Sequence, residues 1–156
     1  MLTTYPQTQR GATLIEVLVT LVVLAIGLLG MAGLQTMSIK SNQSAYYRSQ
    51  ASFLAYDITE RMRANRTAAN AGEYDVSFPA SFSATTSDSR AKQDLSEWLD
   101  NLADKLPNGT GKISREISPE NTLVTLEVRW DDSRGAIQAS DNDKKSIETF
   151  VYWTGI

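Results

Sequence analysis

One long stretch near the N-terminus constrains this chain more than any other feature. Between Arg10 and Lys40 the only charged residue is Glu16, and residues 17–39 form an uncharged run of 23 residues. As a helix this run would be about 35 Å long, which exceeds the roughly 30 Å of hydrocarbon in a bilayer. The sequence therefore predicts a helix long enough to span a membrane.

Three interpretations compete for this run. A secretory signal peptide would find a small-x-small cleavage site at residues 30–32, but one basic residue before the run and Glu16 at its head are unfavourable. A plain membrane anchor fits the length and leaves Glu16 unexplained. The third interpretation, which we favour, takes the junction before the run as a processing signal.

That junction reads RGATLIEV at residues 10–17. It resembles the class III signal of type IV prepilins and pseudopilins, in which a short polar leader ends in glycine before a Thr-Leu-Ile-Glu string and an apolar helix. The resemblance implies cleavage after Gly11 by the prepilin peptidase, which also methylates the new N-terminal amine of Ala12. Most members of the family carry Phe where this chain has Ala12. Because the cut precedes the helix, the mature protein keeps it.

Glu16 has a local and an intermolecular interpretation. Locally, Thr13-x-x-Glu16 before an apolar run is a capping box, with Thr13 at the N-cap and Glu16 bonding back to the backbone. Holding a carboxylate near the centre of a membrane helix costs about 2.5–3.5 kcal/mol, less at its edge, and an apposed cation would offset that cost. The family resemblance implies that Glu16 meets the N-terminal amine of a neighbouring subunit during assembly. Both roles can coexist, and we favour assembly.

Three glycines, Gly27, Gly30 and Gly33, interrupt the apolar run at three-residue spacing. Each costs about 1 kcal/mol of helix propensity relative to alanine. One interpretation is close packing of helices in the membrane. The other, which the family suggests, is a segment that can unwind when the subunit leaves the bilayer for a filament.

Beyond Lys40 an apolar stripe at helical spacing predicts that the helix continues. The stripe consists of Tyr47, Ala51, Leu54, Ile58 and Met62, and we interpret it as core. A helix from about Thr13 to Arg66 follows, with a stop signal at residues 70–72.

The remainder predicts a small mixed domain. Residues 73–91 read as a loop with two aromatic anchors, Phe78 and Phe82. Five apolar residues share one face of a short helix: Leu95, Trp98, Leu99, Leu102 and Leu106. Alternation through Val124, Leu126, Val128 and Trp130 predicts a half-buried strand, with a preceding strand around Ile113 and Ile117 and a final one at residues 147–153. The fold class is therefore α+β: a long N-terminal helix packed on a small antiparallel sheet.

Motifs in this domain add a second resemblance. The strings at residues 61–66, 73–75, 98–109 and 128–132 resemble the PilV-type minor pilins, also called pilus modification proteins. The resemblance implies a leader at 1–11, a transmembrane and polymerisation helix at 12–39, an amphipathic helical part at 40–67 and a globular head at 68–156. The implied partners are other minor pilins, the major pilin, the prepilin peptidase and the pilus assembly platform. The head would lie in the periplasm, above the inner membrane, and later on the pilus at the cell surface.

Composition excludes several functions. The chain has no cysteine and no histidine, which excludes disulfides, thiolate or imidazole metal sites and Ser-His-Asp or Cys-His catalysis. A net charge of −3 gives no bulk positive field for nucleic acid. Many pilins close a C-terminal loop with a disulfide; here packing and strand pairing must hold that region.

Two charged clusters have plain interpretations. Asp131-Asp132 and Asp141-Asn142-Asp143 lack the ligand order of a calcium loop, so we interpret them as parts of a solvated loop. The cluster at residues 61–66 is interpreted as a solvated helix face or one that contacts acidic neighbours. We expect no enzyme, no metal and no cofactor.

The leading hypothesis is a minor pilin of a bacterial type IV pilus that takes part in pilus assembly or initiation, and thereby in attachment and twitching motility. A minor pseudopilin of a type II secretion system is the closest rival. A membrane-anchored periplasmic binding module that does not polymerise is the third hypothesis.

Overall fold

A computed structural model of the chain describes residues 13–79, 85, 88–117, 122–133 and 147–155. Its contacts divide the chain into two compact units, Met1–Ser38 and Ile39–Ile156. The helix α1 (Leu14–Ala64) contributes residues to both units. The predicted cleavage and methylation positions, Gly11 and Ala12, lie outside the described residues.

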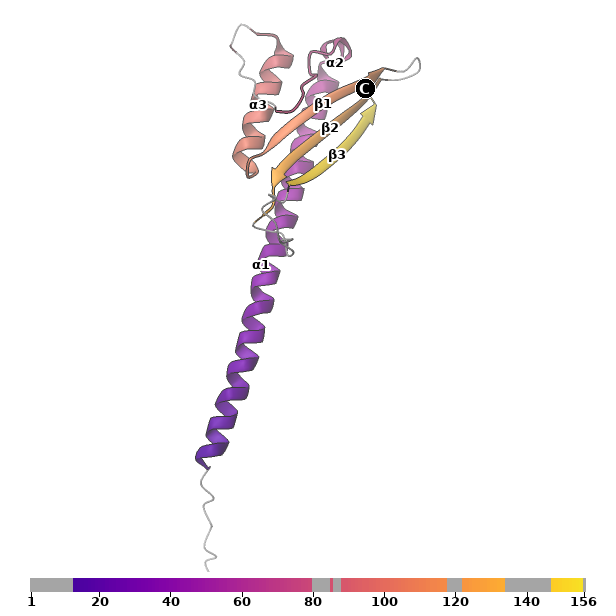
Figure 1. Ribbon diagram of the computed structural model, residues 1–156. Helices are drawn as coiled ribbons and strands as arrows, with labels where there is room; N and C mark the ends of the chain where they lie inside the picture. Colours follow the sequence, from indigo (N-terminus) through magenta and orange to yellow (C-terminus); the bar gives the residue numbers. More distant parts are fainter. Residues whose placement is uncertain (1–12, 80–84, 86–87, 118–121, 134–146, 156) are drawn as a thin grey trace, which may run out of the picture. The chain divides into compact units, whose positions relative to one another are not determined.

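The second unit contains a three-stranded antiparallel sheet in the order β1-β2-β3 (Figure 1). The strands are β1 (Thr110–Ile117), β2 (Thr122–Asp131) and β3 (Ile147–Gly155). Leu126 of the central strand pairs with Ile113 on one side and with Tyr152 on the other. In β2 buried residues alternate with half-exposed ones from Val124 to Trp130, as the period of two in the sequence predicts.

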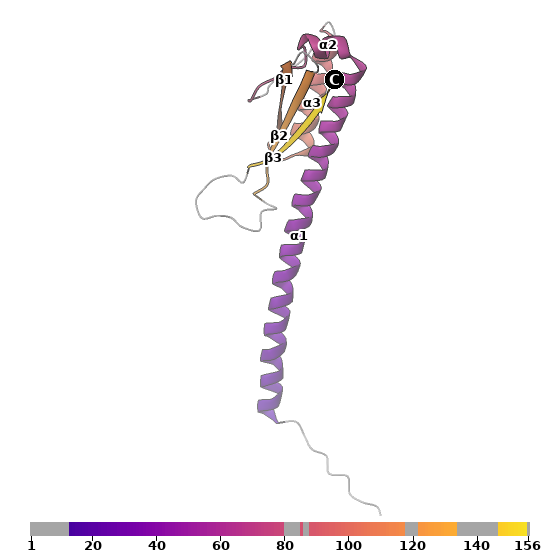
Figure 2. The same cartoon turned by 90° about the vertical axis from the view of Figure 1, so that its right-hand side faces the viewer.

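Helices cover the inner face of this sheet. Two views at right angles show the sheet alongside the C-terminal part of α1, with α3 (Arg90–Lys105) near β1 (Figures 1 and 2). The core contains the whole predicted α1 stripe and, from α3 and its end, Leu95, Trp98, Leu99, Leu102 and Leu106. The α+β arrangement expected from the sequence is confirmed.

Close approach between α3 and the sheet requires a glycine in β1. A Cβ atom on Gly111 would lie 2.2 Å from Cη2 of Trp98, whose side chain is fully buried. The indole Nε1 of Trp98 donates a hydrogen bond of 3.0 Å to the carbonyl of Leu54 in α1. Trp98 of α3 thus packs against both α1 and β1 and holds the three elements together.

The long helix ends slightly earlier than the sequence predicts. It stops at Ala64, and a separate short helix, α2 (Arg66–Ala71), follows Asn65. Gly72 ends α2 with a φ of 88°, in the left-handed region, and its N–H donates to the Ala69 carbonyl at 3.1 Å. Glycine adopts this conformation without a Cβ penalty and so ends a helix. The predicted stop signal at residues 70–72 is confirmed, as the end of α2.

Candidate functional site

The first turn of α1 contains Glu16. Its N–H donates to the Thr13 carbonyl at 3.0 Å and, more weakly, to the Thr13 hydroxyl at 3.4 Å. Thr13 therefore caps the helix, but within residues 13–79 the reciprocal bond from the Thr13 N–H to the Glu16 carboxylate is not formed. The capping box is half present. The Glu16 side chain is exposed and makes no hydrogen bond or ion pair with any described residue, so its charge is available to a partner.

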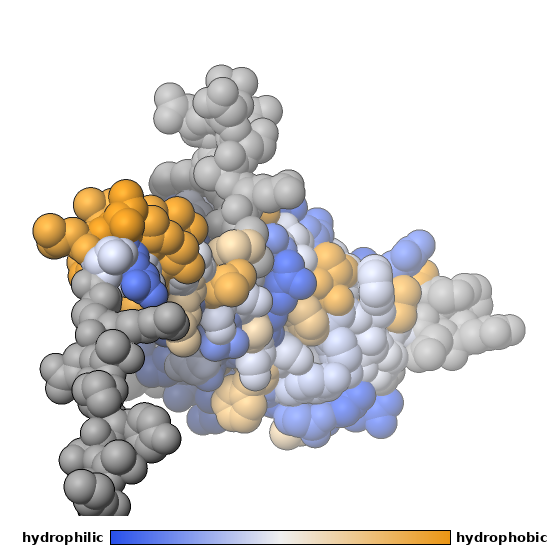
Figure 3. Space-filling model, turned by 90° about the horizontal axis from the view of Figure 1, so that it is seen from below, coloured by the Kyte–Doolittle hydropathy of each residue, from blue (hydrophilic) through white to orange (hydrophobic). Residues whose placement is uncertain are grey.

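Glu16 precedes a large apolar surface. Every residue from Thr13 to Asn42 is exposed, including aliphatic side chains such as Leu29 at 74% and Leu34 at 70%. The most apolar window of α1 has a mean hydropathy of 2.7, and none of it is buried within the protein. Figure 3 shows hydrophobic side chains gathered at this end of α1. Such a surface must be covered by lipid or by other chains.

The three glycines of this segment lie within continuous helix. α1 runs unbroken through Gly27, Gly30 and Gly33, and a Cβ atom on any of them would meet nothing within 4 Å. The fold of the isolated chain therefore does not need glycine at these positions. Close packing against another helix and local unwinding both remain predictions for the assembled state.

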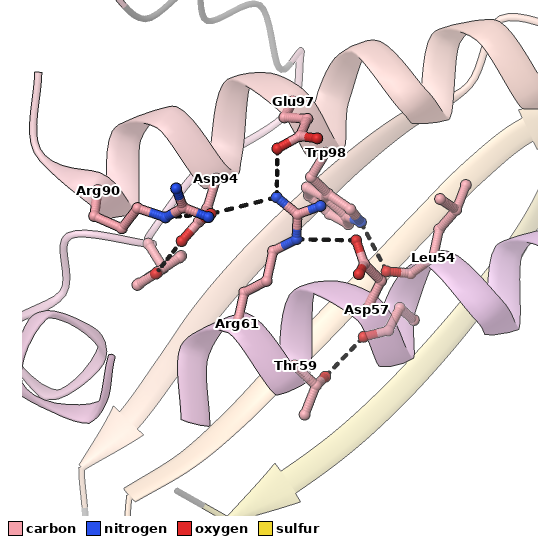
Figure 4. Close-up of polar contacts among 10 residues, drawn as sticks. Leu54, Asp57, Thr59, Arg61, Arg90, Asp94, Glu97 and Trp98 are labelled. Atoms are coloured by element: carbon pink, nitrogen blue, oxygen red, sulfur yellow. Dashed lines mark hydrogen bonds and ion pairs between the residues drawn. The ribbon is translucent and has the colours of Figure 1, made fainter. Parts of the chain in front are cut away.

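In the second unit, Arg61 of α1 links α1 to α3 through ion pairs with carboxylates (Figure 4). Its guanidinium contacts Asp57 at 3.1 Å, Asp94 at 3.3 Å and Glu97 at 2.6 Å. The hydrogen bond to Glu97 is the main cause that raises the pKa of Arg61 and lowers the pKa of Glu97. For Arg61 the solvated-face interpretation is wrong, since its side chain is only 22% exposed; contact with acidic neighbours is what the structure contains.

Asp94 is the buried member of a charged cluster that also contains Asp57, Arg61, Arg90 and Glu97. Its side chain is 3% exposed and also contacts Arg90 at 3.1 Å, while the hydroxyl of Tyr74 donates to it at 2.8 Å. Burial, followed by this hydrogen bond, raises the pKa of Tyr74 to about 12. An open cavity of about 330 Å³ lies beside the cluster, lined by Arg61, Ala64, Asn65, Arg90 and Asp94. Both arginines are already paired with Asp94, so the cluster serves to hold α1, α3 and Tyr74 together.

The interpretation of Asp132 as part of a solvated loop is also wrong. Asp132 is 2% exposed, and its Oδ2 accepts a hydrogen bond of 2.6 Å from the hydroxyl of Ser44 in α1. Its Oδ1 is buried without a hydrogen-bond partner among the described residues. Residues 141–143, the other half of the weighed calcium site, lie outside the described residues. Within the described part of the chain no group of three or more acidic residues could hold a metal ion.

The last strand is fastened to α1 at three levels. Arg48 pairs with Glu148 at 3.1 Å, the rings of Tyr56 and Tyr152 meet edge to face at 4.9 Å between centroids, and Arg63 donates to the Thr154 hydroxyl at 2.9 Å. Residue numbers rise together along both elements, so β3 runs in the same direction as α1. These contacts, together with pairing to β2, hold the C-terminal strand in a chain without cysteine.

Sequence reasoning missed the burial of Asp94, Tyr74 and Asp132. A signal existed for Asp94, because it falls on the apolar face of α3 between Ala91 and Trp98, and a carboxylate at such a position implies a buried partner. Tyr74 and Asp132 sit in irregular segments next to strands and helices, where no period distinguishes buried from exposed residues.

Two protein-family models match parts of the chain. The family model described as type IV pilin Tt1218 matches residues 33–97. The model of the prokaryotic N-terminal methylation motif matches residues 6–32, which include the candidate processing positions and Glu16. No curated protein and no solved structure matches the chain. The two family matches support a type IV pilin with a class III signal, and with the apolar helix they support membrane anchoring.

Proposed function

We propose that this chain, which matches a type IV pilin model over residues 33–97 and the N-terminal methylation motif over residues 6–32, is a minor pilin of the PilV type. It would be cut after Gly11 by the prepilin peptidase and methylated on Ala12. It would then wait in the inner membrane with its head in the periplasm, and enter a pilus together with other minor pilins and the major pilin. Through the assembly platform it would support pilus initiation, and thereby attachment and twitching motility. The role is structural rather than catalytic.

One observation carries the proposal: Glu16, without a partner among the described residues, precedes the stretch of α1 up to Asn42 in which every apolar side chain is exposed. An anchor needs the apolar side chains but not the carboxylate, which is unfavourable next to lipid. A cation from a neighbouring subunit would compensate for it. The new N-terminal amine of such a subunit is a cation that processing after Gly11 would create.

The mature N-terminus tests the proposal directly. Mass spectrometry of the protein purified from membranes should find a chain that begins at a methylated Ala12. A chain that retains residues 1–11, or one cut near residues 30–32, would contradict processing as a prepilin and favour an anchor or a signal peptide.

A minor pseudopilin of a type II secretion system would show the same N-terminus. The match to a type IV pilin model over residues 33–97 favours the pilus. Deletion of the gene should reduce surface pili and twitching while exoprotein secretion continues; the opposite pair of phenotypes would assign the chain to secretion.

A further inference from the structure

The outer edge of the sheet at β3 is open in the structure. β3 pairs with β2 along its whole length, from Ile147 to Gly155, and no other described segment pairs with its second edge. At the opposite side of the sheet, Val76 exchanges two backbone hydrogen bonds of 3.0 Å with Ile113 of β1. Figure 1 shows β3 at the margin of the sheet, with α3 near the β1 side. The free backbone groups of β3 require hydrogen-bond partners that water or an added strand can supply.

β3 lacks the charges that normally protect such an edge. Its residues alternate between the two faces, and the outward set is Ile147, Thr149, Val151 and Trp153, none of them charged. Ile147 is 62% exposed and Trp153 63%. The one charged residue of the strand, Glu148, is paired with Arg48. Edge strands of soluble proteins usually carry lysine, proline or a bulge, because an apolar open edge accepts further strands.

The charges on the outer face of the sheet belong to β1 and β2. Lys112 of β1 and Glu127 of β2 form an ion pair of 2.6 Å, and Arg129 contacts Glu127 at 3.1 Å. Phe78 covers Arg129, with its ring centroid 4.0 Å from the guanidinium carbon. On this face β1 and β2 thus carry charged side chains, whereas the outward side chains of β3 are uncharged.

We infer that the open edge of β3 is the docking site for an extended strand from the head of a neighbouring pilin subunit. An extended backbone satisfies the hydrogen-bonding groups of the edge, and β-branched or aromatic side chains in register continue the outward row of β3. This inference rests on the proposed function, which places other pilin heads beside this one.

The small size of the contact favours a partner that is anchored in the same membrane. One added strand along nine residues of β3 provides less contact than the roughly 1,200–2,000 Å² of a stable interface between free proteins. A subunit anchored in the same membrane does not pay the full cost of association, since its effective concentration near the edge is about millimolar. The occupant is therefore the head of a pilin subunit anchored in the same membrane rather than a soluble protein.

Site-specific photo-crosslinking in cells tests this docking site in the full-length chain. A photoreactive phenylalanine analogue in place of Trp153 should give an adduct with one further pilin-sized chain. The matched control is the same analogue at Ser114, which shares the row of Trp153 and Thr125 on the outer face but belongs to β1. We expect no adduct from Ser114.

A charged variant provides the second measurement. The side chain of Thr149 lies in the outward set of β3, so Thr149→Lys adds a charge beside the open edge and leaves the contacts of Tyr152 and Thr154 with α1 in place. This variant should abolish the adduct from position 153. The head should keep its resistance to protease. Ser114→Lys should leave the adduct unchanged. An absent adduct, an equal adduct from position 114, or an adduct that survives Thr149→Lys would each overturn the inference.

The N-terminus of the same sample distinguishes the two proposals. Protein that retains residues 1–11 contradicts the proposed function, whatever the adducts are. Correctly processed protein that gives no adduct at position 153 contradicts only the docking site.

Discussion

At the start of α1 a single carboxylate combines a weak structural role with an available charge. The Glu16 backbone N–H is bound by Thr13, whereas its side chain is exposed. As an acidic residue in the first turn it adds about 0.3–1 kcal/mol through the helix dipole. That contribution is too small to decide whether a membrane helix forms. The charge is therefore better explained by a partner outside the chain.

Replacing Glu16 separates these two contributions. We expect Glu16→Ala to leave a protein that is anchored and processed but absent from sheared pili, because the cation of the neighbouring subunit loses its counter-charge. The matched control is Thr13→Ala, which removes the cap and keeps the charge, and it should still enter pili. Immunoblots of sheared pili, normalised to processed protein in the membrane, measure the effect. Recovery of Glu16→Ala at the normal yield would contradict the assembly role.

Because the pKa of Tyr74 is raised in the folded protein, the head should lose stability at alkaline pH. Burial and the bond to Asp94 raise the pKa of the Tyr74 phenol from 10.0 to about 12. Because the folded protein keeps this proton to a higher pH than the unfolded chain, the stabilisation is complete below pH 10 and is lost as the pH rises through about 12. Urea unfolding between pH 9 and 12, at pH steps of about one unit, should show the free energy of unfolding of the wild type falling more steeply than that of Tyr74→Phe. Parallel slopes for the two proteins would show that Tyr74 does not titrate in this way.

At the scale of elements, β3 depends on α1 because β2 is the one strand that pairs with it among the described residues. The three levels of contact are not equivalent. The pair of Arg48 and Glu148 is largely exposed, at 61% and 34% for the two side chains, and exposed pairs contribute little. The aromatic contact of Tyr152 with Tyr56 packs against the core, and it is the level at which we expect most of the stabilisation.

Tyr152→Ala should therefore loosen the last strand. We expect a loss of about 1–3 kcal/mol in the free energy of unfolding, typical of removing a packed aromatic side chain. Amide exchange over residues 147–155 should become faster than in the rest of the sheet. Arg48→Ala is the control, with an expected change within about 0.5 kcal/mol. Equal effects of the two substitutions would mean that the ion pair, and not the ring contact, holds β3.

How far the elements could be predicted depended on the range of the interactions involved. The α1 stripe ending at Met62 and the alternation from Val124 to Trp130 report burial through neighbours on the same element, so a local period was sufficient. Arg61 meets Asp94 and Glu97 across separations of 33 and 36 residues. No pattern within α1 contains that information, because it depends on how α3 packs. For the same reason Asp132, which bonds to Ser44 88 positions away, read as a loop residue.

At the scale of the whole molecule, the two units have opposite relations to their surroundings. The described residues of the first unit are all exposed, and the first buried residue among those described is Tyr47 in the second unit. Residues 13–38, the described part of the first unit, therefore contribute no residue to the core of the head. We expect their apolar surface to contact lipid or neighbouring subunits, which a folding measurement on the single chain does not report.

Removal of residues 1–38 should consequently leave a folded, soluble head. All the core residues, and all three contacts between α1 and β3, lie in residues 39–156, so the truncated protein should keep the cooperative unfolding transition of the full chain in detergent, within a few degrees in Tm. Near-ultraviolet circular dichroism from the buried tryptophans Trp98 and Trp130 reports the tertiary packing. The control is a truncation of residues 1–54, which removes Tyr47, Ala51 and Leu54 from the core and should abolish the transition. A head from residue 39 without near-ultraviolet signal would show that the apolar segment supports the fold, and would contradict the division of the chain into an assembly segment and an independent head.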